Sequence, residues 1–306
     1  MTAVLRPGPT VTHGRPAFEG ANIRTWIGFK HFMYLVEQGV LQWLRDQGTS
    51  ARDLFLEHGL GAEIVDCSVQ LPAVLELDDE VKVEVTPGRG DKLNVQLSVV
   101  REGAEVTVLR GKVTVALVRE RAADTTAAAP EALAHLEVPT LTSTVERVAI
   151  PTWETAESVL TAQPGAFLWS WRAPYFYCHY SDRVQHSGFV RTLEEVVDRY
   201  LADRGISVGR MLSERAWIPV VSRARVRLLE DARMEETVHT VFTVTDILRG
   251  VMFDGRMDCY VHRGPELVPV ATAQILHGYA IAAGPGAGGM AQLDEGVVHA
   301  LIGDRT

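Results

Sequence analysis

Residues 186–205 read HSGFVRTLEEVVDRYLADRG, and residues 29–48 read FKHFMYLVEQGVLQWLRDQG. In each stretch apolar residues recur three or four positions apart, which predicts an amphipathic helix with one buried face. The two stretches lie 157 residues apart (186 minus 29), and at this offset residues 29–85 align with residues 186–242 without a gap. The chain therefore contains two copies of one unit.

The rest of the alignment supports this repeat. Eleven aligned positions are identical, among them Phe32 with Phe189 and Glu37 with Glu194. Two copies of more than 100 residues predict a pair of similar units on one chain, because solenoids use shorter and more numerous repeats. Alternating apolar residues predict strands at 81–85, 93–99 and 106–118, and again at 238–244, 251–261 and 268–281.

One helix on a long antiparallel sheet, made twice, is an α+β architecture. We expect the two helices to lie side by side under one continuous or abutting sheet. We divide the chain into a first unit (1–120), a linker (121–145), a second unit (146–283) and a tail (284–306). A short helix is expected at 131–135 and another within 290–302.

The composition limits the possible partners. Of 306 residues, 46% are hydrophobic and 23% are charged, which is a globular composition. The formal net charge of -9 argues against nucleic acid and anionic membranes as partners. The sequence contains no apolar run of about 18 residues, the length that would predict a membrane span. Residues 1–9 show no apolar segment typical of a signal peptide. Three scattered cysteines favour reduced thiols, so we expect a cytoplasmic location.

The most specific motif lies in the second copy. It consists of Tyr180-Ser181-Asp182, followed by His186, Phe189 and the pair Glu194-Glu195. This arrangement resembles the hotdog domains of the acyl-CoA and acyl-ACP thioesterase superfamily, which often show a Tyr-x-Asp strand end, a His or Asn loop, an aromatic residue and a Glu-Glu pair. The resemblance covers most of residues 20–119 and 165–281. It implies a double hotdog, with two long helices each wrapped by a curved antiparallel sheet.

The first copy departs from this pattern. Thr25, Phe29 and Gln38 stand where the second copy has Asp182, His186 and Glu195. No Asn follows His186, and the loop before it is shorter than in members with a His-Val-Asn-Asn sequence. By analogy with double-hotdog thioesterases, we expect the second unit to be catalytic. An acyl pocket should then be built around residues 182–195, with residues 24–38 supplying walls or cofactor contacts.

Thioester hydrolysis needs a group that activates water and donors that stabilise the oxyanion. Asp182, Glu194 and Glu195 are candidate bases, and His186 is a candidate base or donor. At 100° per residue Glu194 falls at the edge of the apolar stripe and Glu195 nearly opposite it. Glu195 also lies four residues before Arg199, the spacing of a surface ion pair. The second glutamate is therefore expected to be the more solvated.

The start of the second helix is the candidate oxyanion site. The backbone amides near Ser187, Gly188 and Phe189 are first-turn donors at the positive end of the helix dipole. Gly188 would also allow a thioester to approach the backbone closely.

Four further residues are candidates for substrate contacts. Tyr175 and Tyr177 belong to an aromatic run that we expect on a strand, as core or as pocket wall. Lys30 and His31 at the first helix start could bind the phosphates of CoA or of a phosphopantetheine arm, although a solvated helix start explains them too.

No metal and no separate cofactor are expected. Cys178 and His179 lie next to Asp182 and His186, but strand alternation sends the first two to opposite faces. CoA or phosphopantetheine would enter as part of the substrate. The glycine-rich run 284–289 has too few residues after it for a dinucleotide-binding unit.

The sequence thus predicts an acyl thioesterase acting on an acyl-CoA or acyl-carrier-protein thioester. One alternative is a hotdog hydratase or dehydratase, because Asp182-x-x-x-His186 resembles Asp-x-Asn-x-x-His with one residue fewer and no Asn. Another is a double hotdog that binds acyl groups without catalysis. A homodimer of double hotdogs is a further expectation.

Overall fold

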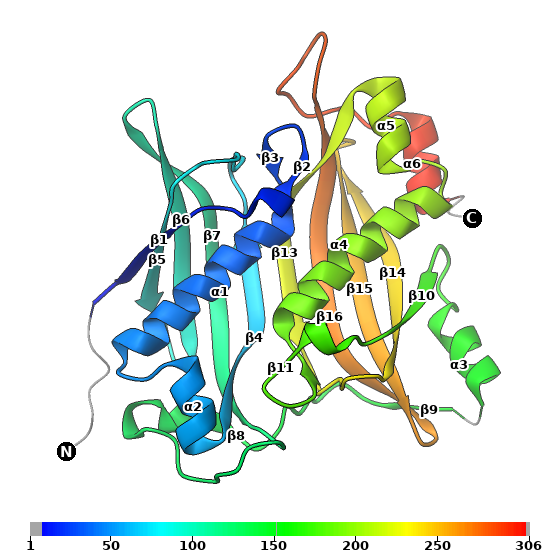
Figure 1. The fold of residues 1–306 in the computed structure, drawn as a ribbon. Helices are drawn as coiled ribbons and strands as arrows, with labels where there is room; N and C mark the ends of the chain where they lie inside the picture. Colours follow the sequence, from blue (N-terminus) through cyan, green and yellow to red (C-terminus); the bar gives the residue numbers. More distant parts are fainter. Residues whose placement is uncertain (1–7, 151, 304–306) are drawn as a thin grey trace.

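The two long helices are the clearest trace of the repeat. The structure, a computed structural model, describes residues 8–150 and 152–303, so the outermost residues of the predicted first unit and tail lie outside the described residues. Helix α1 (Phe29–Asp46) and helix α4 (His186–Asp203) begin and end 157 residues apart, as the alignment predicts. They run side by side in opposite directions across one face of the sheet (Figure 1). The start of each helix therefore lies near the middle of the other.

The helix ends follow from local chemistry that the two copies share. After each long helix comes a glycine in the left-handed region, Gly48 with φ 95° and Gly205 with φ 72°, where residues with a side chain are strained. Short helices follow, α2 (Ala51–His58) and α5 (Val208–Arg215). Ser50 and Ser207 cap them, each accepting the backbone N–H of the third residue on. These short helices were not predicted.

The long strands of the two units belong to one sheet. Its main order is β1-β5-β6-β7-β4-β13-β16-β15-β14-β10, so the second half repeats the first in reverse. The strands of the first unit are β1 (Thr10–Gly14), β4 (Leu60–Gln70), β5 (Val81–Pro87), β6 (Lys92–Arg101) and β7 (Ala104–Arg119). Those of the second are β10 (Phe167–Arg172), β13 (Trp217–Leu228), β14 (Thr237–Leu248), β15 (Met252–Arg263) and β16 (Glu266–Ile281). The six predicted strands are all present.

Strands β4 and β13 join the two units and were not predicted. They pair antiparallel, with Gln70 opposite Arg223 and Asp66 opposite Arg227. Between these pairs, Cys67 lies opposite Val226, and both are fully buried. The expectation of one continuous sheet with both helices on one face is therefore confirmed, and the two units share one hydrophobic core.

A small hairpin precedes each long helix. In the first unit it is β2 (Ala21–Ile23) with β3 (Trp26–Ile27), and in the second β11 (Cys178–His179) with β12 (Arg183–Val184). Residues 175–177, expected on a strand, form a 3-10 helix instead, because Pro174 precedes them and Tyr177 N–H bonds back to its carbonyl oxygen.

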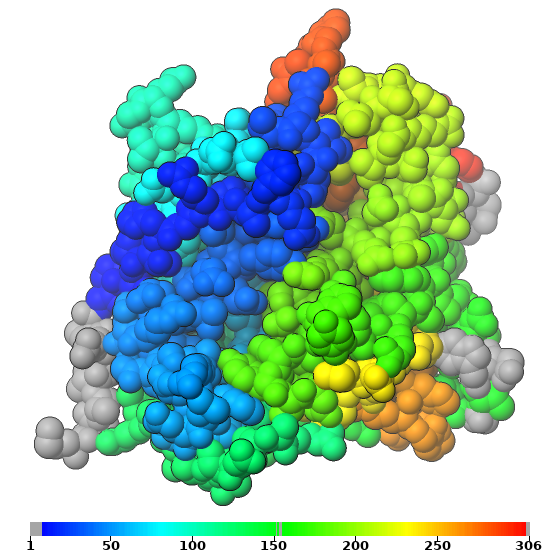
Figure 2. All heavy atoms as spheres, viewed as in Figure 1, coloured from blue at the N-terminus to red at the C-terminus, as the bar shows by residue number. Residues whose placement is uncertain are grey.

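The remaining elements connect or close the units. Between the units lie a 3-10 helix (Glu131–Leu136), β8 (Glu137–Val138), β9 (Val148–Ala149) and α3 (Trp153–Leu160), and the tail holds α6 (Glu295–Ile302). The two expected short helices are thus present, whereas the division into units, linker and tail stays a prediction. In Figure 2 the blue surface of the first unit meets the green surface of the second along the line between α1 and α4. No helix among the described residues is long and apolar enough to cross a membrane.

Candidate active site

A cavity of about 1000 Å³ lies between the two units. The start of α1 and the β2–β3 hairpin bound it from the first unit, and α4, β13 and β16 bound it from the second. Much of the wall is apolar, including Ile27 and Phe32 from the first unit and Val197, Leu201 and Val221 from the second. Its size is at the upper end of ordinary ligand pockets, so it can hold a long apolar chain.

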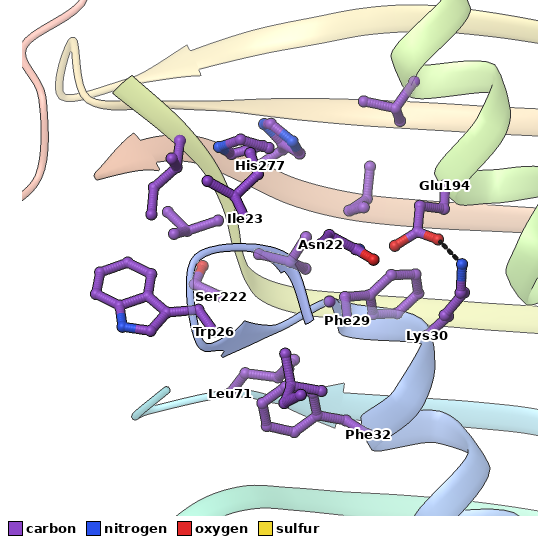
Figure 3. A pocket seen from close by; sticks show the side chains of 18 of the residues that line it. Asn22, Ile23, Trp26, Phe29, Lys30, Phe32, Leu71, Glu194, Ser222 and His277 are labelled. Atoms are coloured by element: carbon purple, nitrogen blue, oxygen red, sulfur yellow. Dashed lines mark ion pairs between the residues drawn. The ribbon is translucent and has the colours of Figure 1, made fainter. Parts of the chain in front are cut away.

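One end of the cavity is polar, and we call it the α1 site: Asn22, Gly28, Phe29, Lys30 and Glu194. Glu194 projects from α4, and its Oε2 lies 3.0 Å from Nζ of Lys30 (Figure 3). A Cβ on Gly28 would lie 2.2 Å from Asn22 Nδ2 and 3.2 Å from Glu194 Oε1. Glycine at this position therefore allows the Asn22 amide and the Glu194 carboxylate to approach the start of α1.

The two charged groups of the α1 site change each other's pKa. Burial raises the pKa of Glu194 above the usual range for a glutamate, although attraction to Lys30 opposes this rise. Burial alone would lower the pKa of Lys30, but attraction and hydrogen bonding to Glu194 outweigh burial and raise it. Lys30 thus stays an ammonium ion, and Glu194, once ionised, is a stronger base than an exposed carboxylate.

The start of α1 supplies backbone donors to this site. Gly28 has no side chain to cap the helix, and the amides of Gly28 and His31 are bonded to the carbonyl oxygens of Gly20 and Gly28. The amides of Phe29 and Lys30 are first-turn donors that have no acceptor within the helix. Together with the positive end of the helix dipole they favour an anionic oxygen.

The opposite end of the helix pair has a different composition, and we call it the α4 cluster: Glu37, Glu63, Glu120, His179 and Arg183. The Arg183 side chain, 4% exposed, donates to Glu63 at 2.6 Å and also to Glu120. His179 Nε2 lies 2.9 Å from Glu63 Oε2. None of these five residues lines the cavity, and in the described part of the chain no group of three or more His, Cys, Asp or Glu could hold a metal ion.

Protonation in the α4 cluster follows from burial and pairing. Burial by itself would raise the pKa of Glu63, but His179 and Arg183 outweigh it and lower that pKa. Burial raises the pKa of Glu37, and the Glu63 charge nearby adds to this rise. Glu63 is therefore held as a paired carboxylate.

Four of the predicted site residues line the cavity: Lys30, Tyr177, Glu194 and Glu195. The two glutamates differ as helix geometry predicts, because Glu195 pairs with Arg199 at 2.7 Å and is 40% exposed, against 31% for Glu194. His31, next to Lys30, is buried and does not line the cavity, and its Nε2 has no partner among the described residues.

The other predicted residues lie outside the cavity. Asp182 forms ion pairs with Arg121 and Arg233, both at 3.1 Å. His186 is buried, and its backbone N–H donates to Glu63 Oε1 at 3.2 Å. Ser187, Gly188 and Phe189 are buried in the first turn of α4, and Tyr175 is exposed.

The expected position of the pocket is therefore corrected. Of residues 182–195, the cavity is lined only by Arg191, Glu194 and Glu195, whereas residues 19–32 form much of its wall. The reason is the antiparallel helix pair, which places the middle of α4 against the start of α1. The catalytic roles assigned to Asp182 and His186 stay predictions.

Several residues of the cavity were not predicted from the sequence, namely Asn22, Arg191, Ser222 and His277. A signal existed for one of them. Arg191 and Tyr34 are aligned in the repeat, and Arg191 Nε donates to the Tyr34 hydroxyl at 2.5 Å. The identity of Glu37 and Glu194 in the alignment was a signal of the helix contact, because each long helix presents one glutamate towards the other.

No protein-family model and no curated protein matches the sequence. Solved structures do match the fold. A provisionally named oleoyl thioesterase from Lactobacillus plantarum aligns with a TM-score of 0.60 at 8% identity, over 89% of this chain and 97% of that one. A 12:0-ACP thioesterase from Umbellularia californica aligns with 0.53 at 11%, over 89% and 94%. An acyl-ACP thioesterase from Bacteroides thetaiotaomicron aligns with 0.52 at 9%, over 88% and 97%. With its two helices on one antiparallel sheet, the chain has the tandem hotdog fold.

Proposed function

We propose that this protein hydrolyses acyl thioesters at the α1 site. The observation that supports this best is the Glu194–Lys30 pair, which meets the uncapped start of α1 at the polar end of a largely apolar cavity. A base, an anion-stabilising helix start and an apolar channel are what thioester hydrolysis needs. Structures of the same fold include proteins named as acyl-ACP thioesterases.

In the proposed mechanism Glu194 acts as general base. It takes a proton from a water molecule as the water oxygen bonds to the thioester carbonyl carbon. The amides of Phe29 and Lys30, with the Asn22 side chain, stabilise the resulting oxyanion. The carbon–sulfur bond then breaks, the proton passes to the leaving thiolate, and a carboxylic acid and a free thiol result.

Lys30 has a supporting role in this proposal. Its ammonium holds the Glu194 side chain in place, and it favours the ionised carboxylate by opposing the effect of burial on the Glu194 pKa. This contact takes the place of the phosphate binding that the sequence suggested for Lys30. The substrate class we propose is an acyl chain on CoA or on the phosphopantetheine arm of a carrier protein.

A screen of acyl-CoA and acyl-pantetheine thioesters of increasing chain length tests the proposal. Release of free thiol is followed continuously, and the acid product is identified by mass. The Glu194→Gln protein, purified identically, reports contaminating esterases. We expect thiol release with wild type and almost none with the variant. Enoyl-CoA that gains water without releasing thiol would instead favour a hydratase, and no turnover of either kind would contradict the proposal.

A further inference from the structure

The side of the cavity away from the Glu194–Lys30 pair also contains polar groups. His277 on β16 and Ser222 on β13 line it there (Figure 3). His277 is 4% exposed, and its Nδ1 has no hydrogen-bond partner among the described residues. The Ser222 hydroxyl donates to the sulfur of Met252 at 3.4 Å, and a thioether is a weak acceptor. Two polar groups in an otherwise apolar part of the wall thus have unused hydrogen-bonding capacity.

A β-bulge places these two residues next to each other. Val221 lies opposite His277 and Arg223 lies opposite Leu276, so Ser222 is the extra residue of β13. Bulges change the direction of a side chain and are common beside active sites. The bulge explains how Ser222, next to the outward-facing Arg223, lines the same cavity as His277.

The first unit shows that the fold does not require polar residues here. Its strands β4 and β7 have the same bulge, with Ile64 opposite Val115 and Asp66 opposite Thr114. Val65 is therefore the extra residue, and Val65 and Val115 occupy the positions of Ser222 and His277. Valine fills both positions in the first unit. The fold therefore does not require the polar pair Ser222 and His277 in the second unit.

The chemistry of His277 limits what it can bind. Burial lowers the pKa of His277 to about 4, so the imidazole is neutral at pH 7. Its ring packs against Phe253, with the ring centroids 4.8 Å apart and the ring planes tilted by 31°. A neutral imidazole offers one N–H donor and one acceptor nitrogen, a match for a hydroxyl or ketone and a poor match for a carboxylate.

We propose that this cavity selects acyl chains that carry a neutral hydrogen-bonding group, a hydroxyl or a keto oxygen. This group forms hydrogen bonds with His277 and Ser222, at a distance from the thioester. The inference rests on the proposed function for the identity of the ligand as an acyl chain. His277 and Ser222 are specificity-determining residues in it and take no part in bond cleavage.

Binding of free acids tests this without any turnover. Fatty acids of one length are compared by calorimetry, unsubstituted or with a hydroxyl at successive carbons. We expect one position to bind about tenfold more tightly than the unsubstituted acid, because the buried nitrogen then gains its partner. His277→Phe should remove this preference and leave binding of the unsubstituted acid unchanged or stronger. Ser222→Val should reduce it, and keeps the test available if His277→Phe does not fold.

Tyr279→Phe is the matched control, because Tyr279 lies on the same strand, has a buried hydroxyl without a partner among the described residues, and does not line the cavity. It should keep the wild-type preference. Equal binding of all acids, or a preference that survives His277→Phe, would overturn the inference. If the preference is found but no thioester is hydrolysed, the proposed function fails and the binding inference stands.

Discussion

The α1 site and the α4 cluster occupy equivalent ends of one antiparallel helix pair, yet only the first borders the cavity. Each has a helix start, a preceding hairpin and a glutamate from the partner helix, Glu194 in one and Glu37 in the other. They differ in the side chains around these parts. Trp26 and Val220 line the cavity at the α1 site. The residues aligned with them are Arg183 and Glu63, which are buried as an ion pair in the α4 cluster.

The difference shows how a duplicated fold can separate two tasks. At the α4 cluster, Glu63 and Glu120 come from the first unit, and His179 and Arg183 come from the second, so every pair joins the units. At the α1 site the residues at the aligned positions line the cavity instead. A few differences at equivalent positions therefore distinguish the end that borders the cavity from the end where ion pairs join the units.

The largest effect is expected at the α4 cluster. Arg183→Met removes the guanidinium that pairs with the buried Glu63 and Glu120, which should lower the free energy of unfolding by about 3–5 kcal/mol. Urea denaturation measures this loss. Arg225→Met is the matched control: Arg225 pairs with Asp66 on the exposed face, 46% exposed, and such pairs contribute at most about 1 kcal/mol. Equal losses in both variants would show that the α4 cluster contributes no more to the free energy of unfolding than an exposed ion pair does.

The next effect compares the two aligned glutamates. Glu194→Gln should lower kcat about 100- to 10,000-fold, the usual contribution of a general base. Glu37→Gln should leave kcat near the wild-type value, since Glu37 does not line the cavity. Steady-state kinetics on the best thioester decide between them. A large loss in Glu37→Gln alone would move the chemistry to the α4 cluster and restore the importance of His186.

A smaller effect is expected from filling the space beside Gly28. Gly28→Ala adds a Cβ against Asn22 and Glu194, and displacement of catalytic groups by about 1 Å can lower kcat up to 100-fold. The backbone at Gly28, with φ -63°, suits alanine, so folding should be unaffected. Gly209→Ala on α5 should keep full activity, because no described atom would lie within 4 Å of the added Cβ. Unchanged kcat in Gly28→Ala would place the reaction away from the α1 start.

The smallest effect concerns pH. The reaction needs ionised Glu194, so kcat/KM should rise with pH through a pKa above the ordinary glutamate range. Lys30 lowers this pKa, so Lys30→Met should raise it further and move the acid limb of the profile to higher pH. Lys82→Met, at an exposed pair on β5, should not move the limb. A shift downward, or none, would remove Lys30 from its proposed role.

The sequence by itself determined the duplication and most of the architecture. Apolar periodicity locates α1 and α4, and alternation locates six strands, because these patterns report which face of a single element is buried. The helix ends repeat as well, because they depend only on residues adjacent in the sequence: the caps Ser50 and Ser207 and the terminating glycines Gly48 and Gly205. The different exposure of Glu194 and Glu195 also followed from helix geometry alone.

Only the tertiary structure decided where the cavity lies. Strands β4 and β13 escaped prediction because buried or interface charges such as Glu63 interrupt their apolar alternation, and Pro219 interrupts β13. Their pairing, together with the antiparallel helices, places Glu194 of one unit against Lys30 of the other, 164 residues apart in the chain (194 minus 30). Contacts at such a separation depend on how the elements pack against each other, and no local pattern of residues encodes that packing.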